Sequence, residues 1–335
     1  MGSTVSARWA NFVSAVALAT GPASVCHAET YALIVSGLGG EPQYEQRFQA
    51  QADAISAAAE KLTGAKSRVV SLSAAGATRE SVRQALKALA GKVGKDDRVM
   101  VVLIGHGTYD GEEYRFNVPG PDLTATELAT LLDQIGAGEQ LVVNGTSASG
   151  AVVDRWRRAG RIIVSATKSG GERTATRFPQ FWLEAVTGGA ADINKDDIVT
   201  AAEAFEYASR RVAESFRTDV SLATEHARLD GGGAGKFQVA RLGAAALSDD
   251  DAALNALLEQ RVKLERDIDA VKERRATLAI EAYYDQLETV LVQLALLQKQ
   301  IDSRAARATG TPMSMSPGSM SPGSKSERSM SGGRQ

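Results

Sequence analysis

Two short segments carry the residue types best suited to chemistry. GHG (105–107) and GTSASG (145–150) each follow directly on an apolar run of the chain. His106 stands between two glycines, so it can act as a general base while backbone N–H groups approach a developing oxyanion. Ser147 offers a hydroxyl on the second segment. The pair suggests acyl transfer, although GHG alone fits a turn with an incidental histidine equally well.

Hydrophobic periodicity predicts the elements that position these segments. Short apolar runs predict strands at 31–37, 68–72, 98–105, 140–144, 161–167 and 236–242. Amphipathic periodicity predicts helices at 42–62, 82–93, 152–158, 179–186 and 198–215. This alternation predicts an α/β fold with a mostly parallel sheet and right-handed crossovers. Ligands of such sheets bind at the carboxyl ends of the strands, where both segments would lie.

A hairpin and a capped helix are predicted between the two segments. The stretch 108–118 turns at Asp110-Gly111, a pair typical of tight hairpins. Thr124 and Glu127 have the T-x-x-E spacing of a capping box, which predicts that a helix begins at Thr124.

With these elements in place, the chain resembles the legumain-type, caspase-like cysteine peptidases. The resemblance covers about 31–216 and rests on VVLIGHG, VVNGTSASG and RIIVSATKSG in that order. It implies a caspase-like three-layer sandwich. It also implies that His106 is the catalytic histidine and that Gly107 and Ser147 form the oxyanion hole. Ser147 then stands where the family has its nucleophilic cysteine, and Ser149-Gly150 matches the Ser-Gly that follows.

The serine puts the activity in question. The only cysteine of the chain is Cys26, so no other residue supplies a thiol after cleavage of a leader. A serine hydroxyl needs a well-oriented base, usually held by a third group, and Asp110 and Asp154 are the acids available for that role. We therefore expect a pseudopeptidase that binds peptides or proteins. The alternative is an active Ser–His hydrolase that uses His106 and Ser147.

Other residues near the strand ends are candidates for a substrate pocket. These are Gly39 after the first strand, and Lys168 and Arg173 after the fifth. The GLGG stretch (37–40) could also be read as a phosphate cradle. It lacks G-x-G-x-x-G spacing, so a structural glycine-rich loop is favoured.

The segment 192–203 matches the spacing of a calcium-binding EF-hand loop. Asp192, Asn194, Asp196 and Glu203 fall at ligand positions one, three, five and twelve. Asp197 replaces the usual glycine, and a helix start capped by Asp or Asn is the alternative explanation. No other cofactor is required. His226 lies in a polar segment and is expected at the surface.

The N-terminus predicts export. Arg8 precedes an apolar stretch, 12–19, and a small-residue cleavage site ends at Ala28. Residues 1–28 are therefore expected to be a signal peptide of a secreted or periplasmic protein. A disordered tail and a lipidated Cys26 are the alternatives, the second weakened by Val25. No later run is long enough to span a membrane, and a net charge of −2 gives no basis for nucleic-acid binding.

The remaining sequence divides into three parts. The peptidase-like domain is expected to span 29–245, followed by a charged helical segment at 248–306 and a disordered Met/Ser/Pro/Gly tail at 309–335. The apolar spacing of the helical segment changes phase near 277–282, which favours a hairpin over one stuttered helix. Its apolar stripe must be covered, so we expect self-association or a protein partner there.

Overall fold

The computed structural model describes residues 28–243 and 251–309. Apart from Ala28 and Thr309, the predicted signal peptide and the predicted tail lie outside the described residues. Both remain predictions.

A six-stranded sheet forms the centre of the α/β domain. Its strands lie in the order β10-β8-β7-β3-β1-β2, and each neighbouring pair except β10 and β8 is parallel. The strands are β1 (Thr30–Ser36), β2 (Val69–Leu72), β3 (Arg98–Ile104), β7 (Glu139–Asn144), β8 (Arg161–Ser165) and β10 (Arg228–Asp230). The four inner strands are the predicted apolar runs, which require cover on both faces.

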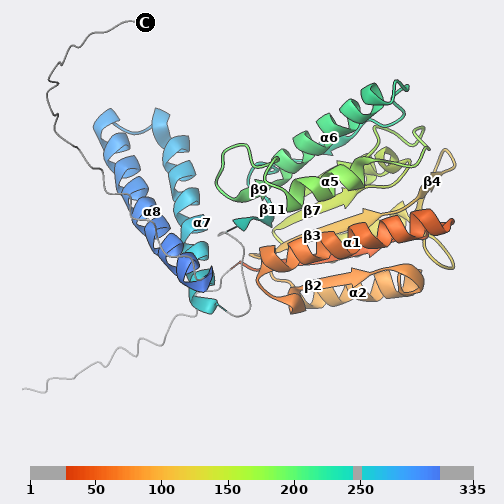
Figure 1. Ribbon diagram of the computed structural model, residues 1–335, viewed down its shortest axis with the longest axis horizontal. Coiled ribbons are helices and arrows are strands. Elements are labelled where there is room, and N and C mark those ends of the chain that lie inside the picture. The colour runs from red at the N-terminus through yellow and green to blue at the C-terminus, as the bar shows by residue number, and fades with distance from the viewer. Residues whose placement is uncertain (1–27, 244–250, 310–335) are drawn as a thin grey trace, which may run out of the picture.

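Helices cover both faces of this sheet (Figure 1). The first set is α1 (Pro42–Thr63), α5 (Phe178–Thr187) and α6 (Ala201–Thr218), and the second is α2 (Arg79–Lys92), α3 (Ala125–Asp133) and α4 (Val153–Trp156). Side chains alternate along β3, so Met100 packs beneath the first set of helices and Val101 beneath the second. The predicted three-layer α/β architecture with a mostly parallel sheet is confirmed.

A small antiparallel sheet follows β3. It consists of β4 (Gly107–Tyr109), β5 (Tyr114–Phe116) and β6 (Leu123–Thr124). Tyr109 pairs with Tyr114 across the turn, so the predicted hairpin is confirmed. The carboxylate of Asp110 accepts hydrogen bonds from the Glu112 and Glu113 N–H groups and closes that turn.

The predicted capping box at the start of α3 is half formed. Thr124 Oγ1 accepts a hydrogen bond from the Glu127 N–H at 3.1 Å. The Glu127 carboxylate turns toward α2 instead, where it lies 2.9 Å from Arg79 and 3.6 Å from Arg83. The glutamate therefore links two helices rather than completing the cap.

The structure corrects the prediction for 198–242. The predicted helix at 198–215 opens with a strand, β9 (Ile198–Thr200), and α6 begins only at Ala201 behind a complete capping box between Thr200 and Glu203. The predicted last strand exists as β11 (Gln238–Arg241), but it pairs with β9 outside the central sheet. Strand β10, at the sheet edge, was not predicted.

The last described segment is a helical hairpin. Helices α7 (Ala252–Glu273) and α8 (Ile280–Thr309) pack against each other and are joined by a short turn that includes a 3-10 segment, Arg274–Ala276. Leu254, Leu258, Leu297 and Ile301 form a small core together with Ile198 of β9. The hairpin thus packs on the α/β domain through β9.

Candidate active site

The candidate site lies where the strand order of the central sheet reverses. From β1 the chain places β2 on one side and β3 on the other. The loops at the carboxyl ends of β1 and β3 therefore lie where α/β proteins of this kind bind ligands. These two loops contain Gly39 and His106 respectively.

His106 is fixed by its backbone and by two aromatic rings. Its carbonyl oxygen accepts a hydrogen bond from the Asn117 N–H at 3.1 Å, just beyond β5. Its half-buried ring meets the Tyr44 and Phe48 rings edge-on, at centroid distances of 5.1 and 5.2 Å. Both aromatics come from the first turns of α1, so helix and hairpin together set the orientation of the imidazole.

The surroundings of His106 favour its neutral form. Burial is the main cause that lowers the pKa of the imidazole below its ordinary value, and the positive charge of Arg47 lowers it further. A backbone hydrogen bond with Gly39 and the charge of Glu41 act in the opposite direction. A neutral imidazole can accept a proton at neutral pH, as a general base must.

Arg47 is a residue of this site that sequence reasoning missed. Its guanidinium carbon lies 4.7 Å from the centroid of the Tyr44 ring and 5.3 Å from that of Phe48. The same two rings also contact His106. Tyr44 and Phe48 were predicted only as members of a buried helical face, and nothing in the local sequence linked Arg47 to a histidine about 60 positions away.

The GHG and GTSASG loops are in contact. A Cβ added to Gly107 would lie 2.5 Å from the Ser147 carbonyl oxygen and 2.7 Å from Thr146 Oγ1. Any side chain at position 107 would push the two loops apart. The glycine therefore lets the chain segment of His106 approach that of Ser147, as the two neighbouring parallel strands β3 and β7 require.

The Ser147 loop makes a tight, buried turn. Ser147 is 2% exposed, and the next residue, Ala148, has φ 56° and ψ 12°. A left-handed conformation at a residue other than glycine is held only by its surroundings and clusters at functional turns. Here the Ala148 N–H donates to the Glu172 carbonyl oxygen at 2.8 Å. Among the described residues, neither the N–H nor the hydroxyl of Ser147 donates a hydrogen bond.

A buried polar network supports this turn from below. Tyr114 Oη lies 2.6 Å from Thr146 Oγ1, which donates to Asn144 Oδ1 at 2.8 Å. Burial raises the pKa of Tyr114 to about 12, so the phenol stays neutral and able to donate. The Asn144 Nδ2 group is buried without a partner among the described residues. The network holds Thr146, the residue before Ser147, in one position.

The matched Ser149-Gly150 pair joins the loop to the next strand end. Ser149 Oγ accepts from the Thr167 N–H at 3.2 Å, and the Gly150 N–H donates to Thr167 Oγ1 at 2.8 Å. A Cβ on Gly150 would lie 2.2 Å from the Ser169 backbone nitrogen. The loops after β7 and β8 therefore pack directly together.

Neither acid proposed to orient His106 lies beside it. Asp110 pairs with Arg115 at 2.6 Å, and hydrogen bonds from Glu113 and Arg115 hold the pKa of its carboxyl low. Asp154 is largely exposed and lies 3.1 Å from Arg157. The acid whose charge acts on His106 is Glu41, which is itself exposed. Asp110 and Asp154, the two acids that the sequence left available for this role, are therefore engaged with arginines instead.

The predicted pocket residues fall into two groups. Gly39 lies at His106, to which its backbone is hydrogen-bonded. Lys168 and Arg173 are exposed on the loop after β8, and Lys168 Nζ is 3.8 Å from the Glu172 carboxylate. The structure thus brings Gly39, Gly107, His106 and Ser147 together at one edge of the sheet. The two cations lie on the loop that packs behind Ser147.

His226 lies at the surface, as expected, but it is not free. Its ring is about half exposed, and Nδ1 contacts the Glu172 carboxylate. Glu172 also accepts from the His226 and Lys168 N–H groups. Because the Glu172 carbonyl holds Ala148, this cluster braces the Ser147 loop from outside.

The segment predicted to bind calcium is a closed turn. Asp192 accepts hydrogen bonds from the Asp196 and Asp197 N–H groups, and Asp197 has φ 63° at the position that usually needs glycine. The Glu203 carboxylate accepts from the N–H and hydroxyl of Thr200. In the described parts of the chain, no group of three or more His, Cys, Asp or Glu side chains is arranged to hold a metal ion. Calcium binding at Asp192, Asn194, Asp196 and Glu203 stays a prediction.

Comparison with known proteins finds similarity to solved structures only. No family model and no curated protein matches it. Similar solved structures include protein GSU0716 from Geobacter sulfurreducens, with 16% identity, a TM-score of 0.43, and coverage of 62% of this chain and 96% of that one. They also include caspase-1 from Spodoptera frugiperda, with 13% identity, a TM-score of 0.44, and coverage of 61% and 87%. At such identities neither likeness bears on which residues are functional.

No helix in residues 28–243 or 251–309 has the length and apolar character needed to cross a membrane.

Proposed function

We propose that this chain is an exported pseudopeptidase of the legumain/caspase-like kind, which binds peptide segments at the strand ends that carry Gly39, His106 and Ser147 without cleaving them. The observation that carries the proposal is the state of the His106 ring. It is held by Tyr44, Phe48 and the Gly39 backbone, and neither proposed acid lies beside it.

Serine chemistry demands more than this arrangement offers. A serine hydroxyl is a weak nucleophile unless a histidine removes its proton, and that histidine works best when a third group orients it. Cysteine needs less help, because its thiol ionises readily beside histidine. Replacing cysteine by Ser147 without supplying an orienting acid therefore retains the shape of the site but removes most of its reactivity.

A peptide could still bind here. The Ser147 N–H donates no hydrogen bond among the described residues, so it is available as a donor to a peptide carbonyl. Arg47 adds a positive charge beside His106. Backbone donors and one cation suit a peptide with an acidic group, which Arg47 would attract.

An active Ser–His hydrolase is the second candidate. Two observations favour it: the lowered pKa of His106, which provides a neutral base, and the left-handed turn at Ala148, which resembles the strained turns that present nucleophiles. Export to the periplasm or cell exterior, proposed from the N-terminal sequence, fits either function.

The test is incubation of the purified protein with a diverse peptide mixture, read by mass spectrometry for cleavage and by affinity capture for binding. Ser147→Ala and Ser147→Cys variants run in parallel, with Ser71→Ala, an exposed serine on β2, as the matched control. A pseudopeptidase captures peptides, leaves them intact, and gains cleavage in Ser147→Cys. Cleavage by the natural protein that disappears in Ser147→Ala establishes the hydrolase instead. If no form of the protein captures or cleaves peptides, both candidate functions are rejected.

A further inference from the structure

The outer face of α8 exposes an unusual amount of apolar surface. Five of the ten large hydrophobic side chains exposed in the described residues lie on this one helix. Leu291, Val292 and Leu296 are 46%, 51% and 60% exposed, whereas Leu297 and Ile301 on the inner face are buried against α7 and β9. A helix with an apolar stripe on both faces needs a second partner.

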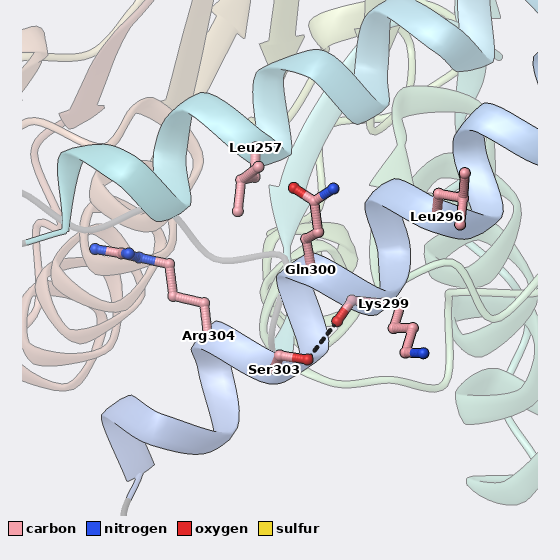
Figure 2. A pocket seen from close by; sticks show the side chains of 6 residues that line it. All are labelled: Leu257, Leu296, Lys299, Gln300, Ser303 and Arg304. Carbon is pink, nitrogen blue, oxygen red and sulfur yellow. Dashed lines mark hydrogen bonds between the residues drawn. The ribbon is translucent and has the colours of Figure 1, made fainter.

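Two hollows lie along the exposed stripe. One, of ≈ 390 Å³, is lined by Tyr284, Leu287, Glu288, Leu291, Val292 and Ala295. The other, of ≈ 500 Å³, is lined by Leu296, Lys299, Gln300, Ser303 and Arg304 of α8 together with Leu257 of α7 (Figure 2). No described residue fills either hollow.

Six residues of this stripe repeat a self-complementary pattern. They stand at helical spacings i, i+3, i+4, i+7, i+8 and i+11, and therefore share one side of α8: Glu288, Leu291, Val292, Ala295, Leu296 and Lys299. We call these six residues the α8 outer face. Along the chain these six residues are an acid, four apolar residues and a base. The spacing between them is the same when it is read from either end of the set.

This symmetry specifies an antiparallel partner. A two-fold axis midway between Gln293 and Leu294 places Leu291 of one copy opposite Leu296 of the other, and Val292 opposite Ala295. It also places Glu288 opposite Lys299 twice, once on each side of the axis. Parallel pairing would instead set Glu288 against Glu288. Neither charged side chain has an ion pair within the described chain, so both are available for this contact.

We propose that a second copy of this chain docks on the α8 outer face, so that the α8 helices of two copies pack against each other in antiparallel orientation. This inference is independent of the function proposed for Ser147. The α7–α8 hairpin lies at the end of the molecule opposite the β4 hairpin (Figure 1), so the two candidate sites of a dimer lie away from this contact and stay accessible.

The test is sedimentation equilibrium of the full chain over a wide range of concentration. The expected result is a reversible monomer–dimer equilibrium, and Leu291→Lys should leave only monomer because two lysines would meet apolar surface at the centre of the contact. Val220→Lys is the matched control, since Val220 is 93% exposed outside the hairpin. Circular dichroism checks that each variant keeps its helices. A natural protein that stays monomeric throughout, or a dimer that Leu291→Lys leaves unchanged, overturns the proposal.

Charge exchange tests the direction of pairing. Glu288→Lys alone and Lys299→Glu alone each create two like-charge contacts in the antiparallel dimer and should weaken self-association about ten-fold or more. The double variant restores both opposite-charge contacts and should recover the natural dissociation constant. Weakening in each single variant without recovery in the double variant overturns the antiparallel register.

Discussion

At the scale of single residues, the protonation of His106 decides what the candidate site can do. Burial and three neighbouring residues act on the pKa of His106, and the causes that lower it are burial and the charge of Arg47. The exposed Arg47 side chain lies over the same two rings that the imidazole contacts, which keeps its charge near His106. Arg47 therefore adds to the effect of burial in favouring the neutral imidazole, and it provides a positive charge beside the site.

We expect Arg47→Gln to raise the pKa of His106, because the change removes a positive charge that opposes the imidazolium. NMR titration of the ring resonances measures this directly, since the chain has three histidines. Arg173→Gln is the control: it removes an exposed arginine that does not act on His106. An unchanged His106 pKa in Arg47→Gln would show that burial alone sets the neutral form.

Glu225 is a second residue whose protonation matters, because it makes the stability of the protein depend on pH. It is 4% exposed, and its carboxylate accepts hydrogen bonds from the Arg177 and Phe178 N–H groups at the start of α5. Burial nevertheless raises its pKa from 4.5 to about 7. The folded protein then holds a proton that the unfolded chain has lost, so stability falls as pH rises through this window.

Glu225→Gln should therefore flatten the dependence of stability on pH. Between pH 5 and pH 8 the natural protein should lose on the order of 2–3 kcal/mol of unfolding free energy that the variant does not lose. Urea unfolding at both pH values gives the comparison. Glu206→Gln, at an exposed position of α6, should behave like the natural protein. Equal pH dependence in Glu225→Gln would mean that Glu225 stays ionised throughout.

At the scale of elements, the site depends on how closely the loops after β3, β7 and β8 approach one another. Glycines allow that approach: Gly107 contacts the Ser147 backbone, and Gly150 contacts the backbone of Lys168 and Ser169. Such contacts involve main chain on both sides and cannot relax by rotating a side chain.

Gly150→Ala should destabilise the protein by about 2 kcal/mol or more, because the new Cβ would lie 2.2 Å from the Ser169 nitrogen. Gly91→Ala is the opposite case. Gly91 lies in α2 with no neighbouring atom within 4 Å of an added Cβ, so alanine there should stabilise by about 0.5–1 kcal/mol. Thermal unfolding of both variants measures the two changes in stability. Equal effects would mean that the two loops do not meet as described.

The sequence predicted those elements whose pattern is local. Long apolar runs became the inner strands, and the polar Asp110-Gly111 turn became the hairpin between β4 and β5. Strand β10 has no apolar periodicity, because it pairs with β8 at the sheet edge through its backbone. Strand β9 was taken as helix because Ile198 and Val199 continue the apolar spacing of α6.

The candidate site was predictable only in part, for a similar reason. His106, Gly107 and Ser147 stand at strand ends, which local sequence marks, and β3 and β7 are neighbours in the sheet. Arg47 reaches His106 from α1, a contact that only the packing of that helix creates. The same absence of tertiary information made Asp110 and Asp154 look like candidate acids.

At the scale of the whole molecule, the helical hairpin and the candidate site lie at opposite ends of the α/β domain (Figure 1). The hairpin is attached through Ile198, which is buried with Leu254 and Leu258, and through Arg241, whose side chain is 6% exposed and lies 3.4 Å from Glu259 of α7. Removing the hairpin would expose an apolar side chain and leave a buried cation without its carboxylate. Neither change reaches His106 or Ser147.

A chain that ends at Gly243 should therefore keep its candidate site but lose stability and self-association. We expect a melting temperature lower by roughly 2–8 °C, which corresponds to about 1–2 kcal/mol for a domain of this size. Peptide capture should equal that of the full chain, and sedimentation should show monomer only. Circular dichroism establishes that the shortened chain is folded before either comparison. Folded protein that no longer captures peptide would mean that the hairpin contributes to peptide binding, and the separation between the two ends of the molecule would then be wrong.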